Sequence, residues 1–229
     1  MPHKNNSCPP SAAATDWDAY YKRAFPTSLW SRAVVRKKLA FLLLSCGLPL
    51  DGSARILEAG GGNSCFYEAV AKTLHPREYA VLDQHAYSLE LLEKKLQKRS
   101  DLVQASLYKD DILRPSALTP FAGKFDLVFS VGLIEHFSEQ DMIRAVQFHL
   151  SCAKPGGFVL LFFPTPTWMY RLVRKTAEVF HLWIFHDERP ILLKTISSLI
   201  SEDQGYILKQ GILYSMILTQ AYVLIRRRN

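Results

Sequence analysis

The sequence lacks an uninterrupted apolar run of the roughly 20 residues that a membrane-spanning helix requires. The apolar segment over residues 39–50 is too short, and Lys209, Gln210 and Gln220 interrupt the apolar C-terminal region. Residues 1–15 are polar and do not show the order of a signal peptide, in which basic residues precede an apolar segment. We therefore expect a disordered tail over residues 1–15 and a cytoplasmic protein.

Cysteine is scarce and shows no pattern. Cys8, Cys46, Cys65 and Cys152 are scattered, with no CxxC pair and no Cys/His spacing typical of zinc ligands. This arrangement argues against a zinc site and against a disulfide scaffold, and it agrees with reduced thiols in a cytoplasm. We predict no metal site.

Acidic residues are outnumbered by basic ones, which gives a formal net charge of +7. Part of the excess lies in Arg226, Arg227 and Arg228, and part lies between residues 32 and 38. Solubility, or a general attraction to anions, explains this charge as well as a nucleic-acid site would. The net charge alone therefore does not indicate a nucleic-acid partner.

The 229 residues suffice for one α/β domain, which we place at residues 16–229. Short apolar segments typical of strands cover residues 54–59, 79–83, 102–108, 125–131 and 158–163, and helical segments cover 29–46, 65–74, 86–99 and 139–153. This alternation predicts a parallel sheet with helices on both faces. Residues 206–216 and 219–226 predict an antiparallel hairpin at the edge of the sheet.

Two further helical regions flank this core. Residues 16–50 predict an N-terminal helical cover, and residues 164–190 predict a helical insertion after the fifth strand. We expect an amphipathic helix over residues 168–185, followed by a helix over 191–200. The polar stripe of the first helix comprises Arg171, Arg174, Lys175, Glu178 and His181. Another face carries Trp168, Leu172, Val179 and Trp183.

Glycines and acids follow the predicted strands at the edge where open α/β sheets bind ligands. The segment Glu58-Ala59-Gly60-Gly61-Gly62 ends the first strand in a turn that leaves bare backbone for a ligand. Asp83 follows the second strand, where a carboxylate can accept hydrogen bonds from a ribose diol. Asp110 and Asp111 follow the third strand, where either can receive an adenine amino group. The pattern predicts a site for a nucleotide-like cofactor.

Together with the segment 125–137 around the fourth strand and the turn Lys154-Pro155-Gly156-Gly157, these motifs resemble the class I S-adenosylmethionine-dependent methyltransferases, of the small-molecule type 11/12 kind. The resemblance covers residues 54–163. It implies a Rossmann-like seven-stranded α/β sheet whose last strand is antiparallel, and S-adenosylmethionine as cofactor. The cofactor-binding residues that it implies are Glu58, Gly60, Gly61, Gly62, Asp83, Asp110, Asp111, Ser130 and Gly132.

The sequence departs from the family pattern at Ser64, where the family often has a third glycine, and a tighter loop is expected there. The competing interpretation is an NAD-type Rossmann enzyme. Counted from Gly60, its Gly-x-Gly-x-x-Gly fingerprint requires glycine at position 65, where this chain has Cys65. The methyltransferase interpretation is therefore favoured.

His136 is the candidate catalytic base, because it follows the fourth strand and an imidazole suits proton removal near neutral pH. The alternative is that His136 only packs the turn. Glu135 is expected either to orient His136 or to cap the next helix. Methyl transfer requires mainly that the protein position the acceptor, so no metal is demanded.

Aromatic residues are the candidates for binding the acceptor. Trp17, Tyr20 and Tyr21, with Trp30, are predicted to cover the cofactor cleft, or simply to pack a first helix on the domain. Tyr20, Tyr21, Trp168 and Tyr170 are the predicted acceptor-binding residues. The aromatic and basic residues of the insertion also suit a lid that touches a hydrophobic or lipid-linked acceptor at a membrane surface.

We predict methyl transfer to an oxygen or nitrogen atom of a small organic acceptor. A second interpretation, RNA or protein methylation, has only the net charge in its favour, and no Asn-Pro-Pro-Tyr-like tetrapeptide follows the fourth strand. A third is a catalytically silent cofactor-binding scaffold that holds a partner through its insertion. We expect a small-molecule partner, with peripheral membrane contact as an option, and no nucleic-acid partner.

Overall fold

The computed structural model describes residues 14–22, 26–214 and 219–229, with the side chains of residues 26–31 left aside. Three sequence predictions therefore fall largely outside the described residues: the tail over 1–15, the turn of the C-terminal hairpin, and the position of the Trp30 side chain. Thr15 is an exception, because this residue of the predicted tail is buried.

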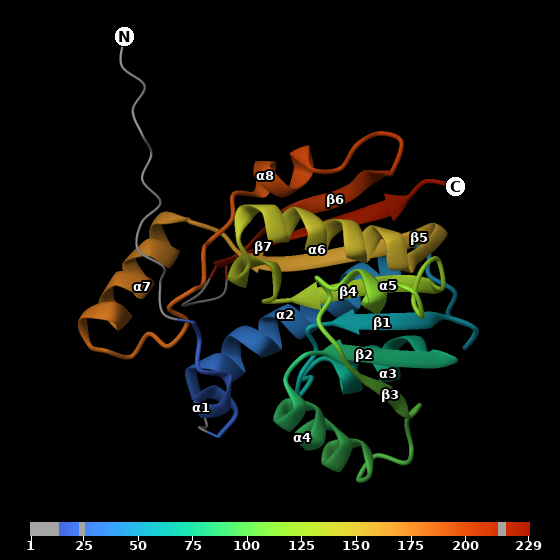
Figure 1. Ribbon diagram of the computed structural model, residues 1–229, viewed down its shortest axis with the longest axis horizontal. Coiled ribbons are helices and arrows are strands. Elements are labelled where there is room, and N and C mark those ends of the chain that lie inside the picture. Colours follow the sequence, from blue (N-terminus) through green and yellow to red (C-terminus); the bar gives the residue numbers. More distant parts are fainter. Residues whose placement is uncertain (1–13, 23–25, 215–218) are drawn as a thin grey trace.

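A seven-stranded sheet in the order β3-β2-β1-β4-β5-β7-β6 forms the centre of the molecule (Figure 1). Its strands are β1 (Arg55–Ala59), β2 (Glu78–Asp83), β3 (Ala105–Lys109), β4 (Phe125–Val131), β5 (Ala153–Pro164), β6 (Gly205–Tyr214) and β7 (Thr219–Arg227). The pairs among β1 to β5 are parallel, whereas β7 runs antiparallel to both β5 and β6. The predicted Rossmann-like sheet with an antiparallel last strand is confirmed.

Helices cover both faces of this sheet (Figure 1). They are α1 (Trp17–Lys22), α2 (Pro26–Ser45), α3 (Tyr67–Leu74), α4 (Ala86–Leu96), α5 (Pro115–Leu118), α6 (Glu139–Cys152), α7 (Trp168–Val179) and α8 (Leu193–Ser198), with a 3₁₀ turn, η1, at Ile134–His136. Buried side chains of α2, α3 and α4 pack on one face, and those of α5, α6 and α8 pack on the other.

The central strands, such as β4 and β5, are mainly apolar because both faces of the sheet are covered there, whereas the edge strands β3 and β6 are largely exposed. Leu160 and its neighbour Leu161 on β5 point to opposite faces and join different core clusters. The same alternation separates Leu127 from Val128 on β4. This double burial explains why continuous apolar runs, rather than alternating ones, marked the strands in the sequence.

Some element ends differ from the predictions. The insertion helix was predicted to reach Phe185, but α7 ends at Val179. The chain reverses at His181, whose φ is +54°, and the backbone N–H groups of Leu182 and Trp183 both donate to the carbonyl oxygen of Ala177. This local capping ends the helix, so residues 182–190 fold back toward the sheet instead of extending the helical axis.

The carboxyl ends of the parallel strands all lie at one edge of the sheet, and α1 and α7 lie at that same end of the molecule (Figure 1). The fold thus brings the segments after β1, β2, β3 and β4 together with the two added helices. Separately, none of the described helices combines the length and apolar character that would be needed to cross a bilayer.

We expect the change Leu160→Ala to lower the free energy of unfolding by about 2–5 kcal/mol, because it opens a cavity between the sheet and the helices. Leu160 has an exposed fraction of 0% and pairs with Phe129 and Leu224 at the centre of the sheet. Urea unfolding followed by circular dichroism measures the change.

The matched control is Leu208→Ala on the edge strand β6, where the side chain is exposed and the expected change is below about 1 kcal/mol. Equal destabilisation by the two substitutions would contradict the assignment of Leu160 to the core.

Candidate active site

A cavity of about 720 Å³ opens at the carboxyl edge of the sheet. This volume lies within the roughly 300–1,000 Å³ typical of small-molecule sites. The predicted site residues that line it are Glu58, Gly60, Gly61, Asp83, Asp110, Asp111, Gly132, His136, Tyr20, Tyr21 and Tyr170. Gly62, Ser130 and Trp168 were also predicted for the site, but they are not among its lining residues.

The glycine loop after β1 is packed too closely for side chains. Gly60 has a φ of +65°, and its N–H donates to the carbonyl oxygen of Leu82 at 2.8 Å, which holds the loop against the end of β2. A Cβ on Gly62, where φ is +46°, would collide with the Tyr21 hydroxyl and lie 3.2 Å from a carboxylate oxygen of Asp83. The hydroxyl of Tyr21 therefore covers Gly62 beside Asp83.

Hydrogen bonds to the buried side chain of Glu58 hold this loop in place. Its carboxylate is buried and accepts hydrogen bonds from the Tyr79 hydroxyl at 2.7 Å and the Ser64 hydroxyl at 2.9 Å. Burial raises the pKa of Glu58 to about 7, against the lowering effect of the hydrogen bonds from Tyr79 and Ser64. Glu58 thus links the end of β1 to the loop.

Ser64 connects the loop to α3. Its Oγ accepts hydrogen bonds from the backbone N–H groups of Phe66 at 3.1 Å and Tyr67 at 2.9 Å, while its own hydroxyl hydrogen goes to Glu58. The structure thus gives a role to the residue that stands in place of the family's third glycine. A glycine at this position would supply neither contact.

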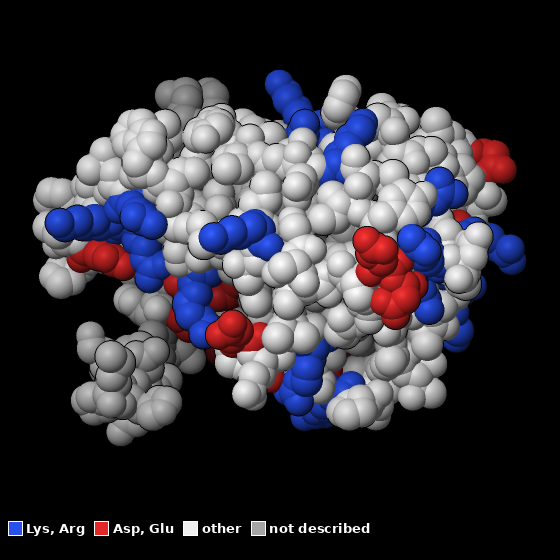
Figure 2. Space-filling model, turned by 90° about the horizontal axis from the view of Figure 1, so that it is seen from above, with Lys and Arg blue, Asp and Glu red and all other residues white. Residues whose placement is uncertain are grey.

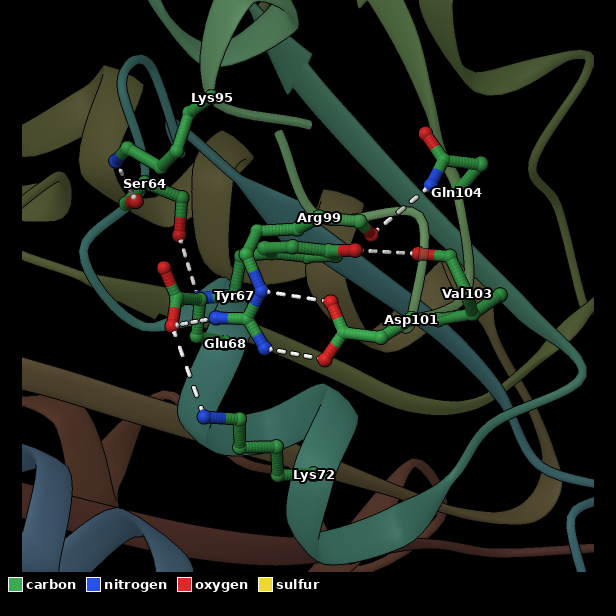
Figure 3. Close-up of polar contacts among 9 residues, drawn as sticks. All are labelled: Ser64, Tyr67, Glu68, Lys72, Lys95, Arg99, Asp101, Val103 and Gln104. Atoms are coloured by element: carbon green, nitrogen blue, oxygen red, sulfur yellow. Dashed lines mark hydrogen bonds and ion pairs between the residues drawn. The ribbon is translucent and has the colours of Figure 1, made fainter. Parts of the chain in front are cut away.

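Polar contacts from α4 hold the same loop from its outer side (Figure 3). The Nζ atom of Lys95 donates to the carbonyl oxygen of Ser64 at 2.6 Å. Tyr67 on α3 donates its hydroxyl to the carbonyl oxygen of Val103, and the guanidinium of Arg99 bonds both Asp101 and Glu68 (Figure 3). These bonds join α3, α4 and the segment before β3 into one frame around the loop.

The acids after β2 and β3 lie next to one another. Asp83 accepts a hydrogen bond from the N–H of His85 at 2.8 Å, and its backbone oxygen accepts from the N–H of Asp110 at 3.2 Å. Burial raises the pKa of Asp83. Asp111 accepts from the N–H of Leu113 at 2.9 Å, and both Asp110 and Asp111 reach the cavity. Either Asp110 or Asp111 can therefore receive an adenine amino group, and the choice between them stays open.

His136 lies in the 3₁₀ turn η1 after β4 and pairs with a residue that the sequence analysis missed. Its Nδ1 lies 2.8 Å from Oδ1 of Asp187, which also accepts the hydroxyl of Thr15. Burial lowers the pKa of His136, and Asp187 opposes this effect. Burial also acts to raise the pKa of Asp187, but the hydrogen bonds from Thr15 and His136 outweigh it, so that pKa is lowered. The pair fixes the orientation of the imidazole.

Glu135 performs neither of its two predicted roles. Ser138 caps α6 by accepting the N–H of Asp141 at 3.1 Å, and Asp187, not Glu135, orients His136. Glu135 has an exposed fraction of 2%, and its Oε2 has no hydrogen-bond partner among the described residues. Ionisable atoms of Glu135, His136 and Glu188 all lie within 4.8 Å of one another, close enough to share a cation. This cluster could not be predicted from the sequence, because Glu188 lies far along the chain from Glu135 and His136.

Some of the aromatic residues that were predicted to bind the acceptor line the cavity, and others do not. Tyr21 of α1 stacks on His85, with ring centroids 5.4 Å apart, and Trp17 contacts His136 edge-on at 5.0 Å. Trp17, Tyr20 and Tyr21 all line the cavity. Phe185, which the sequence analysis did not single out, lies 6.0 Å from His136.

Within the insertion, Tyr170 is buried and lines the cavity, whereas Trp168 is 71% exposed and does not. Side chains that are two residues apart on a helix point to nearly opposite sides, so Trp168 and Tyr170 cannot both reach the cavity. Ser130 is buried in β4 away from the cavity, and its hydroxyl has no partner among the described residues. Trp168 and Ser130 therefore lie outside the lining of this cavity.

Solved structures with the same fold cover most of the chain. One is a magnesium protoporphyrin IX methyltransferase from Synechocystis PCC 6803 with bound SAH, 14% identical, with a TM-score of 0.71 over 92% of this chain and 94% of that one. Another is a putative sarcosine dimethylglycine methyltransferase from Galdieria sulphuraria, 13% identical, with a TM-score of 0.63 over 85% of each chain. A third is an O-methyltransferase family protein from Burkholderia thailandensis, 12% identical, with a TM-score of 0.63 over 85% of this chain and 56% of that one.

At these identities the structural likeness shows the fold. No curated protein matches the chain. Residues 57–159, which run from β1 into β5 and include the glycine loop, Asp83, both aspartates after β3 and His136, match the family model described as a methyltransferase domain. Residues 57–159 therefore match a methyltransferase domain, and the fold around them is shared with solved methyltransferases that bind SAM or SAH.

Proposed function

We propose that this enzyme transfers a methyl group to an oxygen or nitrogen atom of a small organic acceptor, with His136 as the base. The observation that carries the proposal is that His136, which lines the cavity, has its Nδ1 2.8 Å from a carboxylate oxygen of Asp187. An Asp187 carboxylate that accepts the Nδ1 proton leaves Nε2 as the basic nitrogen. The lowered pKa keeps the imidazole neutral near pH 7, as a base must be.

The cavity fits S-adenosylmethionine by the chemistry of its lining. Glycine backbone at residues 60 and 61 and the carboxylates of Asp83, Asp110 and Asp111 face it. The buried Oδ1 of Asn63, another lining residue, has no partner among the described residues and can accept a hydrogen bond from a ligand. When bound, this cofactor supplies an activated methyl group.

The protein then has two tasks. His136 takes a proton from the acceptor, and Asp187 stabilises the imidazolium that results. Trp17, Tyr20 and Tyr21 of the N-terminal cover exclude water from the cavity and hold the acceptor by apolar contact.

The acidic lining favours a small molecule over RNA. A nucleic acid would bring phosphates toward Asp83, Asp110, Asp111, Glu135 and Glu188, and like charges repel. The excess of Lys and Arg lies elsewhere on the surface (Figure 2).

We further propose that α7 lets the enzyme contact an anionic membrane that holds a hydrophobic or lipid-linked acceptor. Exposed apolar side chains follow one another along α7 and just beyond it: Trp168, Leu172, Val179, Phe180 and Leu182. Arg171 and Lys175 are exposed on the same helix, and Figure 2 shows basic side chains at the end of the molecule where α7 lies. Aromatic and basic residues together suit the boundary of an anionic bilayer.

We expect Asp83→Asn to weaken the binding of S-adenosylhomocysteine roughly tenfold to a hundredfold, because a hydrogen bond to a charged group contributes about 1.5–3 kcal/mol. Isothermal titration calorimetry measures the affinity. Asp203→Asn, at an exposed position, is the control. Unchanged affinity of the Asp83 variant would remove this residue from the cofactor site.

The role of His136 is tested by its titration, followed by NMR of the imidazole ring. We expect its pKa to lie below the ordinary value of a histidine side chain and to fall further in Asp187→Asn, because that change removes the interaction that raises it. Since the neutral form is the base, the acidic limb of the rate profile should move to lower pH in this variant.

The matching activity experiment is His136→Gln, assayed with radiolabelled S-adenosylmethionine on a panel of small phenols, alcohols and amines. We expect turnover to fall by about 10²–10⁴ while cofactor affinity stays within twofold. Full turnover in this variant would show that another group removes the proton.

For α7 we expect the double change Trp168→Ser and Leu172→Ser to reduce flotation with phosphatidylglycerol vesicles at least threefold, because it removes exposed apolar area. Phe41→Ser on α2, where the side chain is also exposed, is the control. The membrane proposal would be ruled out if wild-type protein did not bind phosphatidylglycerol vesicles, or bound phosphatidylcholine vesicles equally well.

A further inference from the structure

Glu135 and Glu188 form a pair of buried carboxyl groups in the wall of the cavity, which we call the carboxylate pair. We propose that the carboxylate pair binds the ammonium group of the methyl acceptor, which is therefore an amine or carries one. The inference rests on the proposed function and narrows its acceptor to a cationic organic molecule.

The carboxylate pair makes no direct ion pair among the described residues, although the charge of Arg174 acts to lower the pKa of Glu188. Neither residue makes an ion pair with a Lys or Arg side chain among the described residues: Arg174 bonds the backbone oxygen of Glu188 at 2.8 Å and the hydroxyl of Tyr170 at 3.2 Å, not the carboxylate. Glu188 accepts one hydrogen bond from Tyr170, and Oε2 of Glu135 has no partner. A buried acid without a partner is costly, and a ligand that donates hydrogen bonds and carries positive charge relieves that cost.

The charge of the whole cavity points in the same direction. Its acidic lining residues are Glu58, Asp83, Asp110, Asp111, Glu135 and Glu188, whereas Arg32 is the one Lys or Arg among the described lining residues. The first four follow β1, β2 and β3 and belong to the proposed cofactor side. The carboxylate pair follows β4 and β5, so we assign it to the second ligand, which is the methyl acceptor.

Aromatic rings indicate an organic cation. Trp183, Phe185 and Trp17 line the same cavity, with ring centroids 6.0 Å apart for the first two and 6.2 Å for Phe185 and Trp17. Tyr170, which bonds Glu188, contacts Trp183 edge-on at 6.1 Å. Faces of aromatic rings attract ammonium groups but offer no ligand to a metal ion. The combination of carboxylates and rings thus favours an amine over a metal.

The test compares two probes of similar shape on the protein saturated with S-adenosylhomocysteine. Benzylamine is an ammonium ion at pH 7.5, and benzyl alcohol is neutral. We expect benzylamine to bind at least tenfold more tightly, as measured by NMR titration of the indole N–H signals. Glu135→Gln and Glu188→Gln, two variants of unchanged shape, should each remove most of this preference. Glu139→Gln, at an exposed position on α6, should retain it.

Equal affinity for the two probes, or an unchanged preference in both variants, would overturn the proposal. So would a calorimetric Mn²⁺ or Zn²⁺ site that is lost in Glu135→Gln without any preference for the ammonium. Binding of S-adenosylhomocysteine distinguishes failure of this proposal from failure of the proposed function. If S-adenosylhomocysteine binds and the two probes bind equally, the amine acceptor is wrong and the proposed methyltransferase function stands.

Discussion

The hydrogen bond from the Ser64 hydroxyl to the buried Glu58 joins the end of β1 to the start of α3, and the cavity is built around this link. It constrains the glycine loop from inside, while Lys95 holds the outer side of the loop through the Ser64 carbonyl oxygen. With its backbone held between two elements, the loop needs no reordering when a ligand arrives. Preorganisation of this kind lowers the entropic cost of binding.

A second constraint is electrostatic. The chain carries a formal charge of +7, yet carboxylates dominate the described lining of its cavity. Burial raises the pKa values of Glu58, Asp83, Glu135 and Glu188, so the cavity holds its acids at an energetic cost. A cationic ligand offsets that cost, and the same acids repel phosphate-rich polymers. Under the proposed function, selection by charge therefore operates inside the cavity and not through the net charge of the molecule.

The sequence predicted the features that depend on residues close together in the chain. Strand β4 was predicted with its observed bounds, and Glu58, Asp83 and His136 reach the cavity because each lies at or just after the carboxyl end of a parallel strand. The contact of His136 with Asp187, and that of Asp187 with Thr15, could not be predicted, since these residues lie far apart in the chain and meet through tertiary folding. Glu135 was given only local roles, orienting His136 or capping the next helix, because Glu188, which lies within 4.8 Å of it, is remote in sequence.

Helix α7 shows how one segment can serve two proposed sites. Its inner face carries Tyr170, which bonds Glu188 at the acceptor end of the cavity, and its outer face carries the exposed Trp168. The residues between Val179 and Glu188 fold back, so that Trp183 and Phe185 reach the cavity while Phe180 and Leu182 stay outside. A surface that engages the outer side chains therefore lies directly behind the groups that would hold the acceptor. An amine anchored in a bilayer by an apolar tail could reach the carboxylate pair over this short path, without passing through bulk water.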